Sequence, residues 1–137
     1  MSETTGAEAQ ATGADDEAIA LAHTLFDAAR EGNSALLRSY LDAGAPAGMR
    51  TAAGDSLLML AAYHGHAETV RLLLHHGAGA NGANDRGQTP LAGAVFKGYT
   101  DVARVLIGAG ADPDDGTPTA REAARMFART EILELLG

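Results

Sequence analysis

Four of the five histidines lie close together in the chain, at His64, His66, His75 and His76. Imidazole is a common zinc ligand and a general base, so this density first suggests a metal or catalytic site. At a helical rise of ~1.5 Å per residue, the segment from His66 to His75 spans ~13 Å, whereas zinc-binding nitrogens lie ~2 Å from the metal. One ion therefore cannot bind all four, and we expect structural roles for them; a pairwise surface metal site is the alternative.

Other residue types offer little chemistry. The chain has no cysteine, which excludes disulfides, thiolate zinc sites and cysteine nucleophiles. The glycine-rich run 77–87 follows an expected helix rather than a strand, so it does not match a dinucleotide-binding loop. The acidic run from Asp112 resembles a calcium loop, but its twelfth position is Ala123 instead of a bidentate glutamate. With no residues spaced for a catalytic triad, we predict a protein that is not an enzyme and has no cofactor or metal.

Acidic charge is concentrated at the N-terminus. The chain has 18 acidic and 10 basic residues, a net charge of −8, and residues 1–17 hold five of the acids and no base. We expect this segment to be a disordered acidic tail without the features of a signal peptide. The basic residues are scattered and no long apolar run occurs, so we predict no nucleic-acid partner, no membrane span and a cytoplasmic location.

A period of 33 residues dominates the rest of the chain. Glycine recurs at Gly32, Gly65 and Gly98, and a second set recurs with the same spacing. A period of this length indicates stacked supersecondary units that bury their apolar faces against one another. The members of the second set are Gly44, Gly77 and Gly110, each followed by alanine and preceded three residues earlier by Leu41, Leu74 and Ile107.

The residues at the expected helix ends fit such units. The pair Thr89–Pro90 is typical of a helix start, since the hydroxyl can accept from a free N–H and proline lacks one. Thr100 and Thr130 are expected to cap second helices, and His23 is expected to have a cap-like role. The glycines of the second set are expected to end helices in the left-handed conformation.

Residues 84–116, "NDRGQTPLAGAVFKGYTDVARVLIGAGADPDDG", resemble the ankyrin repeat family. The resemblance implies an all-α ankyrin-repeat solenoid of about four stacked helix-turn-helix units over residues 18–137. Residues 51–83 and 84–116 are two full repeats, and residues 18–50 and 117–137 are the terminal capping repeats.

The chain departs from the family pattern at three positions. Met59 and Ala92 replace the histidine of the T-P-L-H motif, so its hydrogen bonds to the threonine are absent. Gly93 lies inside an expected helix, where glycine costs about 1 kcal/mol relative to alanine. We therefore expect the third unit to open first.

The resemblance also implies a partner site on the loop tips and the exposed side of the first helices. Half of the six aromatic residues fall on this face, at Tyr63, Phe96 and Phe127. Aromatic anchors beside charged residues are typical of protein interfaces; packing between repeats is the alternative. The predicted partner-binding residues are Arg30, Arg50, Asp55, Tyr63, His64, Asp85, Arg86, Gln88, Phe96, Lys97, Met126 and Phe127.

The resulting prediction is a monomeric module that binds an unidentified protein partner through its concave face and loop tips. One alternative is an inhibitory, immunity or regulatory partner of an enzyme. A second alternative is an accessory protein that binds a metal or a small molecule through its histidines.

Overall fold

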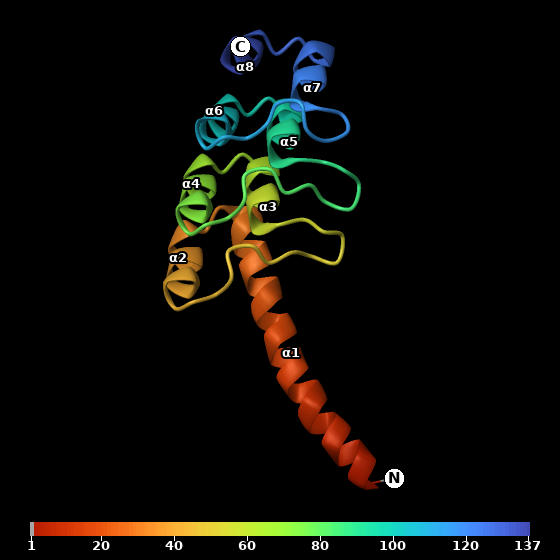
Figure 1. The fold of residues 1–137 in the computed structure, drawn as a ribbon. Helices are drawn as coiled ribbons and strands as arrows, with labels where there is room; N and C mark the ends of the chain where they lie inside the picture. Colours follow the sequence, from red (N-terminus) through yellow and green to blue (C-terminus); the bar gives the residue numbers. More distant parts are fainter. Residues whose placement is uncertain (1) are drawn as a thin grey trace.

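The protein is a stack of helices, shown by a computed structural model that describes the backbone of residues 2–137 and the side chains from Asp16 on (Figure 1). Within these residues the only β-type pairing is an isolated bridge between Arg50 and Ser56. The helices are α1 (Ser2–Glu31), α2 (Ser34–Asp42), α3 (Leu57–Tyr63), α4 (Ala67–His75), α5 (Pro90–Lys97), α6 (Thr100–Gly108), α7 (Ala120–Met126) and α8 (Thr130–Leu136).

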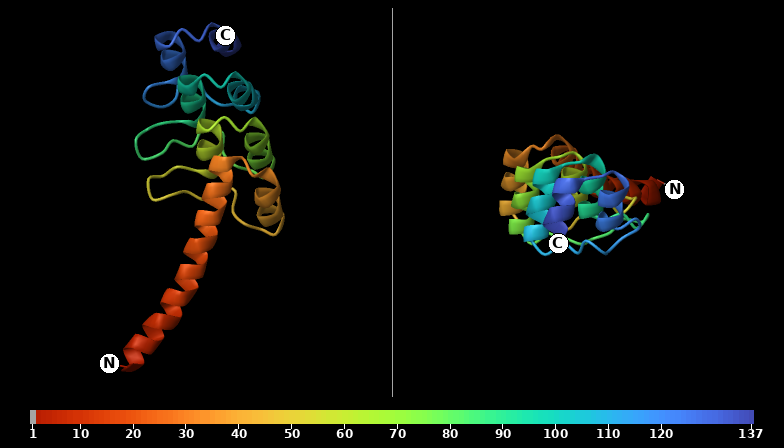
Figure 2. Two further views of the ribbon diagram at one scale, coloured as in Figure 1. Left: turned by 180° about the vertical axis from the view of Figure 1, so that it is seen from behind. Right: turned by 90° about the horizontal axis from the view of Figure 1, so that it is seen from above.

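The helices form two layers. Helices α1, α3, α5 and α7 pack in sequence in one layer, and α2, α4, α6 and α8 do so in the other. The loops that join successive units project from the same side of the stack (Figure 2). This arrangement confirms the predicted all-α solenoid of about four helix-turn-helix units.

The core is continuous from one unit to the next. Seven apolar residues of the second and third units are all buried, and they belong to one hydrophobic cluster. A repeat of this size cannot bury its apolar face alone, so the contacts between units supply the core. These residues are Leu58, Leu60, Val70, Leu73, Leu91, Val102 and Leu106.

Side-chain hydroxyls begin three of the first helices. Thr89 Oγ1 accepts from the N–H of Ala92 at 3.1 Å, as predicted, and Ser56 Oγ accepts from the N–H of Met59 at 3.0 Å. Thr119 forms a capping box with Glu122, in which each side chain accepts from the other residue's N–H. These bonds satisfy N–H groups that a helix start leaves free.

Three predicted caps are wrong. Thr100 and Thr130 are the first residues inside α6 and α8, whose N-cap residues, Tyr99 and Arg129, make no side-chain cap bond. His23 lies in the interior of α1, where backbone N–H groups are bonded within the helix and need no cap. By contrast, Gly44, Gly77 and Gly110 follow α2, α4 and α6 at φ of 104°, 92° and 90°, which confirms the left-handed helix ends.

Helix α1 runs through the segment expected to be a tail. It begins at Ser2, and its N-terminal part extends away from the stack in Figure 1. Every side chain from Asp16 to Leu21 is exposed, and the first buried side chain is that of Leu25. The division at residue 18 and the boundaries between repeats remain predictions.

The side chains of the residues that precede α4, α6 and α8 each contact a glycine of the preceding unit. A Cβ added to Gly32 would lie 2.5 Å from the His66 ring, and one added to Gly65 would lie 3.0 Å from the Tyr99 ring. These glycines have φ of 74° and 81°, so both the backbone and the close approach require glycine. A Cβ added to Gly98 would likewise meet the guanidinium of Arg129. The same close contact therefore explains why glycine recurs at Gly32, Gly65 and Gly98.

None of the described helices is both long and apolar enough to cross a membrane.

Candidate functional site: an apolar groove beside a cationic hollow

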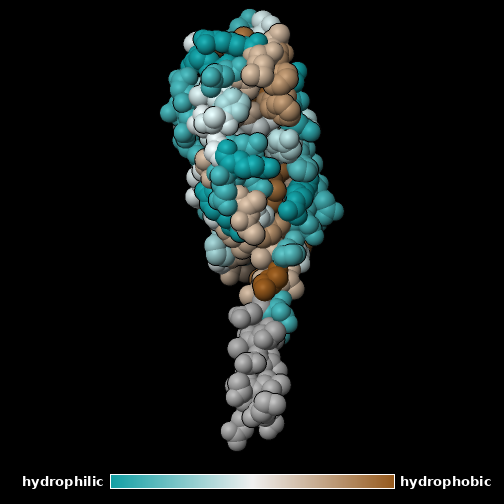
Figure 3. Space-filling model, turned by 90° about the vertical axis from the view of Figure 1, so that its right-hand side faces the viewer, coloured by the Kyte–Doolittle hydropathy of each residue, from teal (hydrophilic) through white to brown (hydrophobic). Residues whose placement is uncertain are grey.

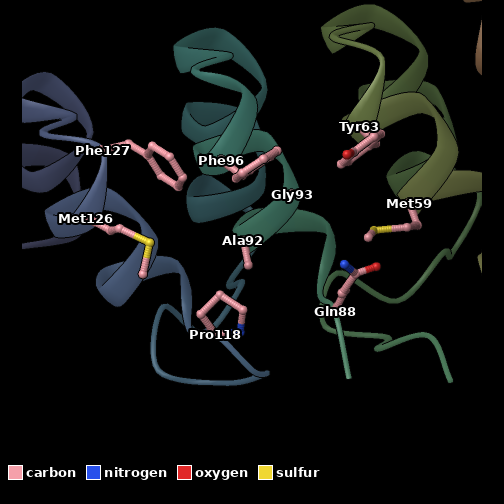
Figure 4. A pocket seen from close by; sticks show the side chains of 9 residues that line it. All are labelled: Met59, Tyr63, Gln88, Ala92, Gly93, Phe96, Pro118, Met126 and Phe127. Atoms are coloured by element: carbon pink, nitrogen blue, oxygen red, sulfur yellow. The ribbon is translucent and has the colours of Figure 1, made fainter. Parts of the chain in front are cut away.

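Helices α3, α5 and α7 enclose an apolar groove of about 270 Å³ on the first-helix layer. Figure 4 shows side chains from these three helices facing a common space. The groove is lined by Met59, Tyr63, Gln88, Ala92, Gly93, Phe96, Pro118, Met126 and Phe127.

Small residues make room for the groove in the middle helix. Gly93 is buried in α5, and a Cβ added there would lie 3.1 Å from Tyr63 Cδ1 and 3.6 Å from Met59 Cε. Contacts of about 3.1 Å are shorter than ordinary carbon–carbon separations of ~3.5–4.0 Å. Tyr63 and Met59 of one unit therefore lie over the glycine of the next.

The far wall of the groove is aromatic. The rings of Phe96 and Phe127 meet edge to face, with centroids 5.0 Å apart and an interplanar angle of 83°. The guanidinium of Arg129 lies 5.8 Å from the Phe127 centroid and donates to the carbonyls of Val95 and Phe96 at 3.2 and 2.9 Å. Arg129 thus bonds the C-terminal end of α5 and supports Phe127 at the same time.

These apolar side chains reach the surface. Phe96 is 46% exposed, Phe127 40% and Met126 69%, while Tyr63 is half-buried against Gly93. Figure 3 shows hydrophobic surface gathered at the end of this face away from the grey segment. A cluster of exposed large apolar side chains on a folded domain indicates a binding surface.

A second hollow of about 290 Å³ adjoins the groove and shares Met59, Tyr63 and Gln88 with it. Here most of the lining residues are polar or charged. Lys97 places its ammonium 5.1 Å from the ring centroid of Tyr63, a residue that lines both hollows. The other lining residues of this cationic hollow are Arg30, Asp55, Leu60, His64 and Arg86.

The pKa of His64, which lines this hollow, is lowered. Burial lowers the pKa below its ordinary value, and His66, Lys97 and Arg30 lower it further. Burial and nearby positive charges both disfavour an imidazolium.

Several predicted partner-binding residues hold the loops together. The buried amide of Asn84 donates to Asp55 Oδ1 at 2.8 Å and to Gln88 Oε1 at 2.9 Å. Arg50 donates to the carbonyls of Gly54 and Ala83, and so bridges two successive loops. Asp85 joins the same contact, since its N–H donates to the carbonyl of Ala53.

The structure brings most of the predicted site residues together. Arg50 and Asp85 line neither hollow, and the role of all twelve in partner binding remains a prediction. Those that line the groove or the cationic hollow, or lie directly over Tyr63, are Arg30, Asp55, Tyr63, His64, Arg86, Gln88, Phe96, Lys97, Met126 and Phe127.

The four clustered histidines lie at helix ends. His64 follows α3, and His66 precedes α4, where its Nε2 lies 2.7 Å from the Arg30 carbonyl in agreement with a structural role. His75 ends α4, and His76 follows it, within hydrogen-bonding distance of Leu72 and Asp42. Among the described residues, no three His, Asp or Glu side chains group closely enough to bind a metal ion.

Comparison with known proteins explains the architecture. A family model described as "Ankyrin repeats (3 copies)" matches residues 25–117. The chain belongs to the ankyrin repeat family. Ankyrin repeats are generally protein–protein interaction modules.

Proteins similar to this chain occur among curated sequences and among solved structures. An ankyrin repeat protein of Pseudomonas aeruginosa is 51% identical over 49 residues, which cover 36% of this chain and 29% of that protein. The crystal structure of the human ASB11 ankyrin repeat domain matches with a TM-score of 0.74 and 28% identity, over 82% of this chain and 52% of that one. The chain thus spans about a third to a half of the length of these relatives.

Sequence reasoning missed several residues of the site. Met59 and Ala92 were noted only because they replace a family histidine, and Gly93 only for its cost to the helix. Pro118 and Arg129 carried no signal of their own. The phase of the repeat could have found Arg129, because it aligns with His66 and Tyr99 at the start of a second helix.

Proposed function

We propose that this ankyrin repeat protein binds a partner protein through the groove between α3, α5 and α7 and the loop tips beside it. The supporting observation is the exposure of Phe96, Met126 and Phe127 around one apolar groove. Exposed side chains of this size form the anchors of interfaces, because burying them in a complex removes apolar surface from water.

We further propose that binding, rather than catalysis, is the activity of the chain. The groove lining contains no acid, histidine, serine or lysine, and Tyr63 is its only ionisable side chain, so it offers a contact surface rather than a paired nucleophile and base. The cationic hollow contains His64 and Asp55, but Asp55 accepts a hydrogen bond from Asn84 rather than from a histidine. We expect the chain to act as a monomer in the cytoplasm, where its lack of cysteine is no disadvantage.

Affinity purification from the native organism tests the proposal. The full chain is used as bait beside a groove variant, Phe96→Ser with Met126→Ser, and a control variant, Ile19→Ser with Leu21→Ser. The control side chains are also exposed and apolar, but they lie on α1, outside the groove. We expect a protein that the wild type and the control retain and the groove variant loses. Equal retention by all three would place the interaction elsewhere.

A further inference from the structure

The cationic hollow carries a positive charge, whereas the whole chain is acidic. Residues 1–17 contribute −5 to the net −8, which leaves −3 for residues 18–137. The cationic hollow nevertheless contains Arg30 and Arg86 against a single carboxylate, that of Asp55. Lys97 adds a third cation over the ring of Tyr63, which lines both hollows.

The side chains of Arg86, Lys97 and Arg30 are available to a ligand. Within residues 16–137, neither Arg86 nor Lys97 forms an ion pair. Arg30 pairs with Asp27 at 2.9 Å, but both side chains are exposed, and a pair of this kind contributes little and is readily exchanged. Asp55 already accepts a hydrogen bond from Asn84, so it is engaged within the loops.

The two hollows differ in chemistry and share one wall. The groove at the α5–α7 end is apolar and, at about 270 Å³, is smaller than the ~300–1,000 Å³ typical of sites for drug-sized molecules. It suits one bulky side chain better than a cofactor. The cationic hollow continues from it past Tyr63 toward α1.

Resting on the proposed function, we propose that the partner presents a short acidic peptide segment with one bulky apolar side chain. The apolar side chain occupies the groove among Tyr63, Phe96 and Met126. Carboxylates that follow it along the segment meet Lys97 over Tyr63, and Arg86 and Arg30 in the cationic hollow. The segment therefore runs across the repeats, from the C-terminal units toward α1.

The positions of the cations explain why both features are needed. Apolar burial supplies affinity, whereas exposed charges chiefly set the choice of partner and the rate of association. A basic segment would meet three like charges, and an acidic segment without an apolar anchor would leave the groove empty. The apolar groove and the cations together therefore distinguish this partner from others better than either feature alone.

Selection from a random peptide display library on the full-length protein tests the proposal. We expect enriched peptides to contain a bulky apolar residue next to aspartate or glutamate. The affinity of an enriched peptide is then measured by fluorescence anisotropy at two salt concentrations. We expect Arg86→Glu with Lys97→Glu to weaken binding by about tenfold or more at low salt and by less at high salt.

Matched variants separate the possible outcomes. Arg38→Glu with Arg71→Glu makes the same charge change on α2 and α4, and should alter the affinity less than about twofold. Enrichment of basic or uncharged peptides, or of none, overturns the inference. If enriched basic or uncharged peptides lose binding to the double variant Phe96→Ser with Met126→Ser, the groove remains the binding site. In that case only its preference for acidic partners is refuted. If the enriched peptides bind the groove variant with the same affinity as the wild type, the result contradicts the proposed function as well.

Discussion

The ring of Tyr63 lies over Gly93 of the next repeat, so closely that a Cβ at residue 93 would stand 3.1 Å from Tyr63 Cδ1. A glycine inside a helix costs about 1 kcal/mol relative to alanine. This one leaves the floor of the groove open and lets Tyr63 and Met59 form its wall. The unfavourable residue thus lies where a binding surface needs space.

Replacing Gly93 by alanine should therefore separate stability from binding. The variant gains up to about 1 kcal/mol of helix propensity, offset in part as Tyr63 shifts by a few tenths of an ångström. We expect the melting temperature to stay level or rise, while the affinity for the partner or a selected peptide falls. Thermal unfolding and anisotropy measure the two effects.

Hydrogen exchange gives the local readout of the same change. In the wild type we expect residues 91–98 to exchange before residues 58–65, because α5 contains Gly93. In Gly93→Ala this difference should narrow. A wild-type protein in which residues 58–65 exchange first would show that Gly93 does not weaken α5.

Truncating the aromatic wall should remove binding at little cost to the fold. In Tyr63→Ala with Phe96→Ala we expect partner capture to be lost and the thermal midpoint to fall by only a few degrees. Phe96 is 46% exposed and Tyr63 is half-buried, so their removal opens no closed cavity. A collapse of the midpoint would instead assign both rings to packing between repeats.

Arg129 should stabilise the last two units. Replacement by alanine removes the bonds to the carbonyls of Val95 and Phe96, and we expect the free energy of unfolding to fall by about 1–2 kcal/mol. Lysine should restore little, because it cannot donate to both carbonyls with the geometry of the guanidinium fork. Urea denaturation of both variants measures this. Full restoration by lysine would mean that charge alone matters.

His76 should make stability depend on pH. Its pKa is raised, first by the hydrogen bond to the Leu72 carbonyl and then by that to Asp42, because only the imidazolium donates from both ring nitrogens. The stabilisation is therefore complete below the ordinary pKa of 6.5 and is lost as the pH rises through the raised value.

Asp42→Asn tests this linkage. We expect the pKa of His76, followed by NMR, to move down toward its ordinary value. The stability advantage of the wild type over the variant should shrink as the pH rises. An unchanged His76 pKa would mean that the hydrogen bond to Asp42 does not raise it, and that the bond to the Leu72 carbonyl alone does.

The periodic part of the fold was predictable, since a 33-residue period fixes which residues stack and where helices end. Thr89 and the glycines of the second set, Gly44, Gly77 and Gly110, act locally, so their roles could be inferred from the sequence. The caps assigned to Thr100 and Thr130 failed because α6 and α8 begin at these residues, one position after the N-cap, and the cap assigned to His23 failed because α1 begins well before it. A propensity for capping does not set the register of a helix when packing between repeats does.

The candidate site was predictable only in part. The phase of the repeat placed Tyr63, Phe96 and Phe127 on one face, but it could not show that Gly93 makes room between them. The engagement of Arg50, Asp55 and Gln88 in the loops also escaped prediction. Their partners lie 29 or 33 residues away or depend on the course of a loop, and residue type alone does not specify such contacts.

Methyl NMR of the methionines tests the central claim, that the partner binds in the groove. Met59 and Met126 line the groove, whereas Met49 lies in the loop after α2, outside both hollows, and provides an internal control. On addition of the captured partner or a selected peptide to the full chain, we predict that the methyl signals of Met59 and Met126 shift while that of Met49 stays in place. Binding that shifts Met49 and leaves Met59 and Met126 unchanged would contradict the account.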